Sequence, residues 1–190
     1  MATKLTPAGR RILDTAAALF YDQGLHAVGV DTVAREAGVT KKTLYDCFGS
    51  KDELIAAYLR ERDERWRDRL TRTVEAAGDP RARLLATFDA LGTWMRAENP
   101  RGCAFVNAFA ELPAADHPGH RVATEQKEWL LGYLTDLASG TGLPHPETLA
   151  RRLLLLHEGA TVAYGTGVLP DAAEEARAAA EVLLGGGTPR

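Results

Sequence analysis

Residues 29–51 read GVDTVAREAGVTKKTLYDCFGSK, and this stretch predicts two short helices joined by a tight turn. Apolar residues recur at helical spacing in its first half, at Val30, Val33, Ala34 and Ala37. Gly38 should end that helix, because glycine adopts left-handed backbone angles without a steric penalty. Thr40 can then cap the second helix by accepting a hydrogen bond from a free amide of its first turn. Two short helices around a glycine turn are typical of a helix-turn-helix.

The second helix of this pair has one apolar side and one polar side. Leu44 and Phe48 lie one turn apart and should face inward. The residues left to face outward are Lys41, Lys42, Thr43 and Tyr45. A recognition helix enters a major groove about 12 Å wide, where lysine donates to guanine and threonine contacts thymine. The pattern therefore indicates double-stranded DNA as a partner, although an isolated basic turn is often only a solvated face.

The same residues resemble the TetR family of one-component bacterial transcription regulators. The family pattern is A-x-x-A-G-V-[ST]-x-x-x-L-Y-x-x-F-x-x-K-x-x-L, matched here by Ala34, Ala37, Gly38, Val39, Thr40, Leu44, Tyr45, Phe48, Lys51 and Leu54. The resemblance covers roughly residues 8–60. Two positions depart from it: Cys47 stands where the family most often has His, and Gly29 where it often has Ser or Thr.

The resemblance implies a set of DNA contacts. Lys41 and Lys42 would read bases, Tyr45 and Lys51 would hold phosphates, and Thr32 would add a phosphate contact. With Thr40 and Thr43 of the leading turn, the expected DNA-binding residues are Thr32, Thr40, Lys41, Lys42, Thr43, Tyr45 and Lys51. Gly29 offers no side-chain contact, so only backbone amides at that helix start remain to hold a phosphate.

The rest of the 190-residue chain shows helical periodicity and no strand pattern or internal repeat. We expect an all-α, nine-helix protein, with helices from Pro7 to before Gly24, two in the quoted stretch, then at about 51–77, 80–98, 102–112, 118–138, 146–165 and 170–184. Pro residues mark several of the starts. The expected domains are 1–50 for the helix-turn-helix, 51–78 for a connecting helix, and 79–190 for effector binding and dimerisation.

Composition limits the compartment and the chemistry. Residues 1–51 have seven Lys or Arg and five Asp or Glu, whereas the remainder is acidic, which suits a protein that contacts phosphates at one end. We expect a reduced, cytoplasmic protein with no membrane span, cofactor or metal, since the chain has two cysteines and scattered histidines such as His117 and His120. Cys47 is either a small core residue or a thiol whose oxidation weakens DNA binding, and we expect no bridge to Cys103.

A second copy of the chain and a small molecule are the other expected partners. A single helix-turn-helix contacts few phosphates, so the resemblance implies a homodimer through the helices at about 146–184. Leucines on two flanks of the first of these helices, and Ala172, Ala173, Ala176, Ala180 and Leu183 on the second, would form the interface. The resemblance also implies a largely apolar effector, with candidate contacts Phe88, Trp94, Phe105, Phe109, Trp129, Tyr133, His157 and Glu158. For each aromatic residue the simpler interpretation is ordinary core, and His157 with Glu158 can equally be a structural pair.

These features favour a ligand-responsive transcription regulator, most simply a repressor that binds a pseudo-palindromic operator as a dimer. An activator, or a helical interaction module that never contacts DNA, is the alternative on the same fold. An enzyme is disfavoured, because the chain lacks a P-loop, H-E-x-x-H, paired C-x-x-C and G-x-S-x-G. Gly165-Thr166-Gly167 resembles the start of a dinucleotide loop but follows no strand.

Overall fold

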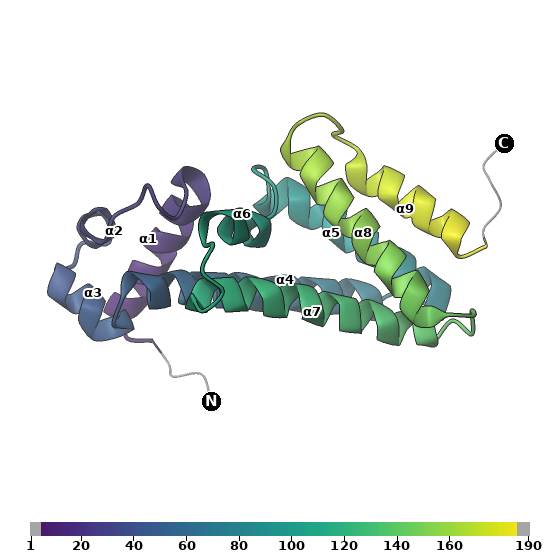
Figure 1. Ribbon diagram of the computed structural model, residues 1–190, viewed down its shortest axis with the longest axis horizontal. Helices are drawn as coiled ribbons and strands as arrows, with labels where there is room; N and C mark the ends of the chain where they lie inside the picture. Colours follow the sequence, from purple (N-terminus) through teal and green to yellow (C-terminus); the bar gives the residue numbers. More distant parts are fainter. Residues whose placement is uncertain (1–4, 186–190) are drawn as a thin grey trace. The chain divides into compact units, whose positions relative to one another are not determined.

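The computed structural model describes residues 5–185, and within them it contains nine α-helices and no β-strand (Figure 1). The helices are α1 (Pro7–Gln23), α2 (Val30–Glu36), α3 (Lys41–Phe48), α4 (Lys51–Glu75), α5 (Pro80–Glu98), α6 (Ala104–Glu111), α7 (Pro118–Ser139), α8 (Pro146–Gly165) and α9 (Ala172–Leu183). The all-α prediction is confirmed. None of these helices combines the length and the apolar character that crossing a bilayer requires.

Side-chain caps explain where several helices begin. Thr6 Oγ1 accepts a hydrogen bond from the Gly9 amide at 3.1 Å, directly before the proline that opens α1. Ser50 Oγ accepts from the Glu53 amide at 3.1 Å at the start of α4. The Asp79 carboxylate accepts from two amides of α5 at 2.9 and 3.0 Å. Each bond satisfies a donor that has no partner inside the helix.

Three helix ends differ from the expected ones by two residues. The helix α4 stops at Glu75 rather than near residue 77, and α9 begins at Ala172 rather than at Pro170. The helix α6 begins at Ala104 rather than at 102, because Gly102 has a φ of 79° and cannot continue a right-handed helix. Apolar periodicity did not reveal these local breaks.

The chain divides into two compact units that do not follow the expected domain boundaries. The first unit is Met1–Asp63 with Ala104–Glu125, and the second is Glu64–Cys103 with Gln126–Arg190. The helix α6 joins the first unit because Glu111 bonds to the loop after α1: its carboxylate accepts from the His26 amide at 2.9 Å, and its carbonyl lies 2.6 Å from His26 Nε2. The helices α4 and α7 each contribute residues to both units.

The core of the first unit holds α1, α2, α3 and the start of α4 together. Fully or almost fully buried side chains from these helices are Ile12, Leu13, Phe20, Val33, Leu44, Leu54 and Leu59. The rings of Phe20 and Tyr58 pack with centroids 6.0 Å apart. Because truncating such buried side chains typically costs about 2–5 kcal/mol each, this core fixes the relative positions of α2 and α3.

The core of the second unit is built largely from α5, α8 and α9, which contact one another (Figure 1). Phe88, Leu84 and Met95 of α5 and Leu153 of α8 are buried in it. The small residues of α9 also face this core: Ala172, Ala173, Ala176 and Ala180 are at most 7% exposed. These alanines therefore serve packing within the chain, whereas the sequence had suggested that they contact a second copy.

Candidate nucleic-acid interface

The turn between α2 and α3 has the geometry of a helix-turn-helix. Gly38 adopts a φ of 63°, and the following Val39 amide donates back to the Ala34 carbonyl at 3.0 Å. Thr40 Oγ1 then accepts from the Thr43 amide at 3.1 Å, so α3 begins directly after the turn. The glycine turn and the threonine cap are both confirmed.

Burial of one side of α3 determines which side faces outward. Leu44 is completely buried, and Phe48 is partly buried. Lys41, Lys42 and Tyr45 are exposed on the opposite side. The other expected contacts also belong to the first unit: Thr40 is exposed, whereas Thr32, Thr43 and Lys51 are partly buried. This is the orientation that a recognition helix needs, with polar side chains on its leading turn.

Both lysines of the leading turn form ion pairs with nearby aspartates. Lys41 Nζ lies 3.0 Å from Asp31 of α2, and Lys42 Nζ lies 2.7 Å from Asp46 of α3. The hydrogen bond that Lys41 donates to Asp31, together with the negative charge of Asp31, raises the pKa of Lys41, so this lysine is a cation at neutral pH. Neither aspartate is among the residues predicted from the sequence. The spacing of four residues between Lys42 and Asp46 was a usable signal, whereas the Lys41 pair joins two helices.

Gly29 occupies the N-cap of α2 with an extended backbone and, in the described chain, no side-chain capping bond. A Cβ atom added there would meet nothing within 4 Å among the described atoms. Neighbouring atoms therefore leave room for a larger side chain at position 29. Cys47 is partly buried, with its sulfur 3.9 Å from Thr6 Oγ1, and both cysteines are free thiols.

Comparison with known proteins identifies this arrangement. The sequence profile described as "Bacterial regulatory proteins, tetR family" matches residues 12–58. The crystal structure of SCO4454, a TetR-family transcriptional regulator from Streptomyces coelicolor, is 33% identical, and the alignment covers 95% of this chain and 97% of that one with a TM-score of 0.87. The chain belongs to the TetR family. It is thus a helix-turn-helix transcription regulator rather than an enzyme.

The similar proteins include both a transcriptional activator and a transcriptional repressor. The "HTH-type transcriptional activator FasR" of Mycolicibacterium smegmatis is 36% identical over 80 residues, which span 42% of this chain and only 36% of that protein. The "HTH-type transcriptional repressor KstR2" of the same organism is 26% identical over 147 residues, covering 75% of this chain and 72% of that protein.

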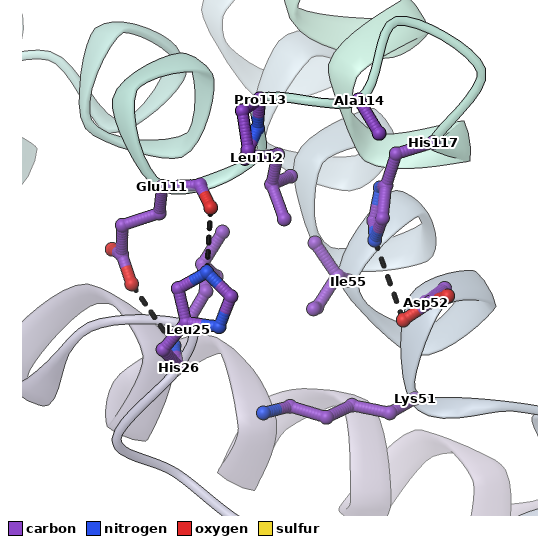
Figure 2. A pocket seen from close by; sticks show the side chains of 10 residues that line it. All are labelled: Leu25, His26, Lys51, Asp52, Ile55, Glu111, Leu112, Pro113, Ala114 and His117. Atoms are coloured by element: carbon purple, nitrogen blue, oxygen red, sulfur yellow. Dashed lines mark hydrogen bonds and ion pairs between the residues drawn. The ribbon is translucent and has the colours of Figure 1, made fainter.

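Lys51 lies at the rim of a cavity in the first unit of this TetR-family protein. The cavity has a volume of about 220 Å³ and an apolar wall formed by Leu25, Ile55, Leu112, Pro113 and Ala114. Figure 2 shows the Lys51 side chain extended along one edge, with its ammonium group directed toward the loop that carries His26.

Two polar contacts at this cavity tie α6 and the start of α7 to the loop after α1 and to the first turn of α4 (Figure 2). One is the pair of bonds between Glu111 and His26 described above. In the other, His117 Nδ1 accepts from the Gly119 amide at 3.0 Å, and His117 Nε2 lies 3.3 Å from Asp52 Oδ1. Since Nδ1 is an acceptor, the ring hydrogen is on Nε2 and is donated to the carboxylate. These contacts join segments that are remote in sequence.

The expected effector residues are distributed over both units. Phe105 and Phe109 belong to the first unit; Phe105 is buried, whereas Phe109 is 52% exposed and lies with its ring 4.4 Å from that of His120. In the second unit, Trp129 stacks on Tyr133 at 5.1 Å, and Trp94 packs against Trp66 at 5.6 Å. These aromatic residues therefore form several separate ring contacts.

His157 and Glu158 have separate partners instead of pairing with each other. Thr87 Oγ1 donates to the Leu84 carbonyl at 2.6 Å, so it accepts from His157 Nε2 at 3.0 Å. Burial, with a smaller effect from the Lys127 charge, lowers the pKa of His157 to about 3, and the ring is neutral at physiological pH. Its Nδ1 is buried and finds no hydrogen-bond partner within residues 5–185.

Glu158 forms an ion pair with Lys127 at 2.8 Å. Burial by itself lowers the pKa of Lys127, but the neighbouring Cys103 and Glu158 outweigh that effect and raise it. The Cys103 sulfur lies 3.6 Å from the same ammonium group. The sequence analysis did not select Lys127, because its partners lie 24 and 31 residues away in the chain.

Proposed function

We propose that this protein is a cytoplasmic, ligand-responsive regulator that binds a pseudo-palindromic DNA operator as a homodimer and most simply represses transcription. The observation that supports this most directly is the orientation of α3. Complete burial of Leu44 directs Lys41, Lys42 and Tyr45 outward from a rigid core. A fixed basic helix face is what major-groove recognition requires.

The proposed DNA contacts follow from this orientation. Thr40, Lys41, Lys42 and Thr43 meet base edges, because they form the leading turn of α3. Tyr45, Lys51 and Thr32 contact phosphates on either side of the groove. The ammonium groups of Lys41 and Lys42 exchange their aspartate partners for DNA on binding.

A dimer is supported by apolar side chains that the chain leaves exposed on α8 and α9. Leu155 is 71% exposed and Val162 is 53% exposed. They are seven residues apart, on one side of α8. Val182 of α9 is 48% exposed. Burying such a side chain contributes about 1.5–3 kcal/mol before the cost of association is subtracted, so this surface favours pairing with a second copy.

The dimer is tested with Leu155→Glu, which places a charge on the exposed side of α8. Size-exclusion chromatography with light scattering should show a dimer for the parent protein and a monomer for the variant at micromolar concentration. Val106→Glu is the matched control, since Val106 is also exposed but lies on α6. A monomeric parent protein, or a Leu155→Glu dimer as stable as the parent, would contradict the proposed interface.

Effector control requires a route from the ligand to the helix-turn-helix. Of the eight expected effector contacts, six belong to the second unit, and we place the effector among these: Phe88, Trp94, Trp129, Tyr133, His157 and Glu158, with the His157 Nδ1 available to a hydrogen-bond donor. The helix α7 contains some of these residues, and the His117–Asp52 contact lies directly before its first turn. An effector that prefers one arrangement of these contacts shifts the population of DNA-binding conformers.

We propose repression rather than activation because the match to a named repressor covers more of this chain than the match to a named activator. KstR2, named a repressor, matches 75% of this chain, whereas FasR, named an activator, matches only 42%. A reporter gene under the protein's own upstream region distinguishes the two. Deleting the regulator should raise expression of the reporter; a fall on deletion would establish activation instead.

DNA binding itself is tested with the upstream region of the regulator's own gene at two salt concentrations. Phosphate-driven binding weakens steeply with salt, with a slope of about 0.9 for each phosphate neutralised. Lys42→Ala should reduce specific binding more than non-specific binding, because Lys42 meets bases. Lys51→Ala should reduce both equally and lower the salt slope. If the two variants behave alike, the proposed division between base and phosphate contacts is wrong.

A further inference from the structure

The second unit contains a cavity that none of the features above explains. It lies between the start of α5, the loop that joins α7 to α8, the first turns of α8 and the end of α9. Its volume is about 420 Å³, which is within the usual range of roughly 300–1,000 Å³ for small-molecule sites. None of the eight residues expected to contact the effector lines it.

The charged groups of this cavity are all of one sign. Arg81 and Arg152 line it beside the imidazole of His145, and the described lining includes no Asp or Glu. Neither guanidinium group forms an ion pair with any residue in the range 5–185. The carboxylate nearest in sequence to Arg81, that of Asp79, is already used by two backbone amides of α5.

A second cavity in the same unit is also lined by arginines, but there each arginine has an acidic partner. Between α5 and α9, Arg96 lies 3.0 Å from Glu174, and Arg177 lies 3.1 Å from Asp89. Those guanidinium groups are neutralised by acids of the chain itself. Arg81 has only a small electrostatic interaction with Asp79, and neither Arg81 nor Arg152 is ion-paired among the described residues, so both present positive charge to one open cavity, which attracts an anion.

The other residues that line the cavity indicate that the uncharged part of a ligand would be aliphatic. Leu143, Pro144, Leu149, Leu183 and Leu184 line the cavity, and all five are aliphatic. Thr148 adds a hydroxyl group. The side chain of His145 also reaches the cavity from a left-handed backbone with a φ of 57°, the one positive φ among the described residues other than glycine. The cavity thus combines an aliphatic surface with a cationic rim.

We propose that this cavity binds a small organic anion that carries a carboxylate or phosphate on an aliphatic chain. The guanidinium groups of Arg81 and Arg152 hold the oxyanion, because their planar forks match carboxylate and phosphate oxygens. The leucine side chains of the cavity pack against the aliphatic part of the ligand. All the lining residues belong to the second unit, whereas the helix-turn-helix belongs to the first.

Isothermal titration calorimetry of the intact chain, without DNA, tests the site with octanoate and octyl phosphate. At least one of the two should bind saturably with one molecule per chain, and their relative affinity shows whether carboxylate or phosphate is preferred. Octylamine has the same chain and the opposite charge, and it should not bind. The absence of saturable binding by both anions, or equal binding of octylamine, would overturn the proposal.

Two substitutions assign the binding to this cavity. Arg152→Gln and Arg81→Gln should each weaken binding of the preferred anion by about tenfold, the effect of losing one charge-assisted contact. Arg151→Gln is the matched control, because Arg151 is the exposed residue directly before Arg152 in α8 but does not line the cavity. Unchanged circular dichroism spectra show that the variants fold. If Arg151→Gln weakens binding as much as Arg152→Gln, the anion binds through general surface charge and the site is excluded.

Discussion

Replacing Asp46 by Asn should strengthen DNA binding. The Asp46 carboxylate lies 2.7 Å from Lys42 Nζ, one turn away on α3. For Lys42 to donate to a base, its ammonium group must leave this partner. The free carboxylate then remains on the same side of the helix as Lys42 and repels the phosphates of the duplex. The asparagine variant keeps the shape of the side chain and removes both effects.

The size of the effect follows from the exposure of the pair. The side chains of Lys42 and Asp46 are 83% and 61% exposed, so solvent screens their attraction. An exposed pair at this helical spacing contributes about 0.3–0.5 kcal/mol. A dimer contains two such pairs, and releasing both lowers the binding free energy by about 0.6–1 kcal/mol, or three- to fivefold in Kd. The unfolding free energy of the variant should fall by no more than about 0.5 kcal/mol.

Fluorescence anisotropy with a labelled operator duplex at fixed salt measures this change. Glu128→Gln is the matched control, since it removes one negative charge from an exposed site on α7 in the second unit. The control should leave the Kd unchanged. If Asp46→Asn instead binds more weakly than the parent, the carboxylate itself accepts a hydrogen bond from a base, as acidic side chains do from cytosine. That result would refute the reasoning.

Three further predictions concern stability. Thr40→Ala removes the cap of α3 and should lower the unfolding free energy by about 1 kcal/mol in urea denaturation, whereas Thr40→Ser should retain it; equal losses would contradict the capping role. The unfolded chain protonates His157 near pH 6.5, but the folded protein keeps it neutral down to about pH 3, so acid favours unfolding. Protonation of His157 in the unfolded chain should therefore lower the unfolding free energy by about 2 kcal/mol between pH 7 and pH 5. The substitution His157→Leu should abolish this pH dependence. Gly165→Ala would place a Cβ atom 2.6 Å from a backbone atom and should cost about 1–3 kcal/mol in thermal unfolding; Gly132→Ala, with open space around it among the described atoms, should instead stabilise by up to about 1 kcal/mol.

The parts of the fold that were predictable depend on short-range signals. The helix-turn-helix follows from apolar spacing, the left-handed Gly38 and the capping Thr40, all within about ten residues. Pro7 and Pro80 marked two helix starts in the same way. In each case the backbone conformation is set by a residue and its immediate neighbours, so the sequence alone was sufficient.

The features that were missed depend on residues far apart in the chain. Glu111 and His26, whose contact places α6 in the first unit, are 85 residues apart, and His157 lies 70 residues from Thr87. No periodic pattern encodes such pairs. Small residues illustrate a related limit: composition shows that α9 allows close packing but does not show whether α5 and α8 or a second copy uses it.

Selection from a pool of randomised double-stranded DNA tests the central claim most directly, because it presumes no operator. The intact protein should enrich a pseudo-palindrome with half-sites about one helical turn, or 34–36 Å, apart, or a related spacing. The Lys42→Ala variant should enrich a less defined sequence at the half-site positions. Enrichment of no common sequence, or of a single half-site without a symmetric partner, would contradict recognition of DNA by paired α3 helices.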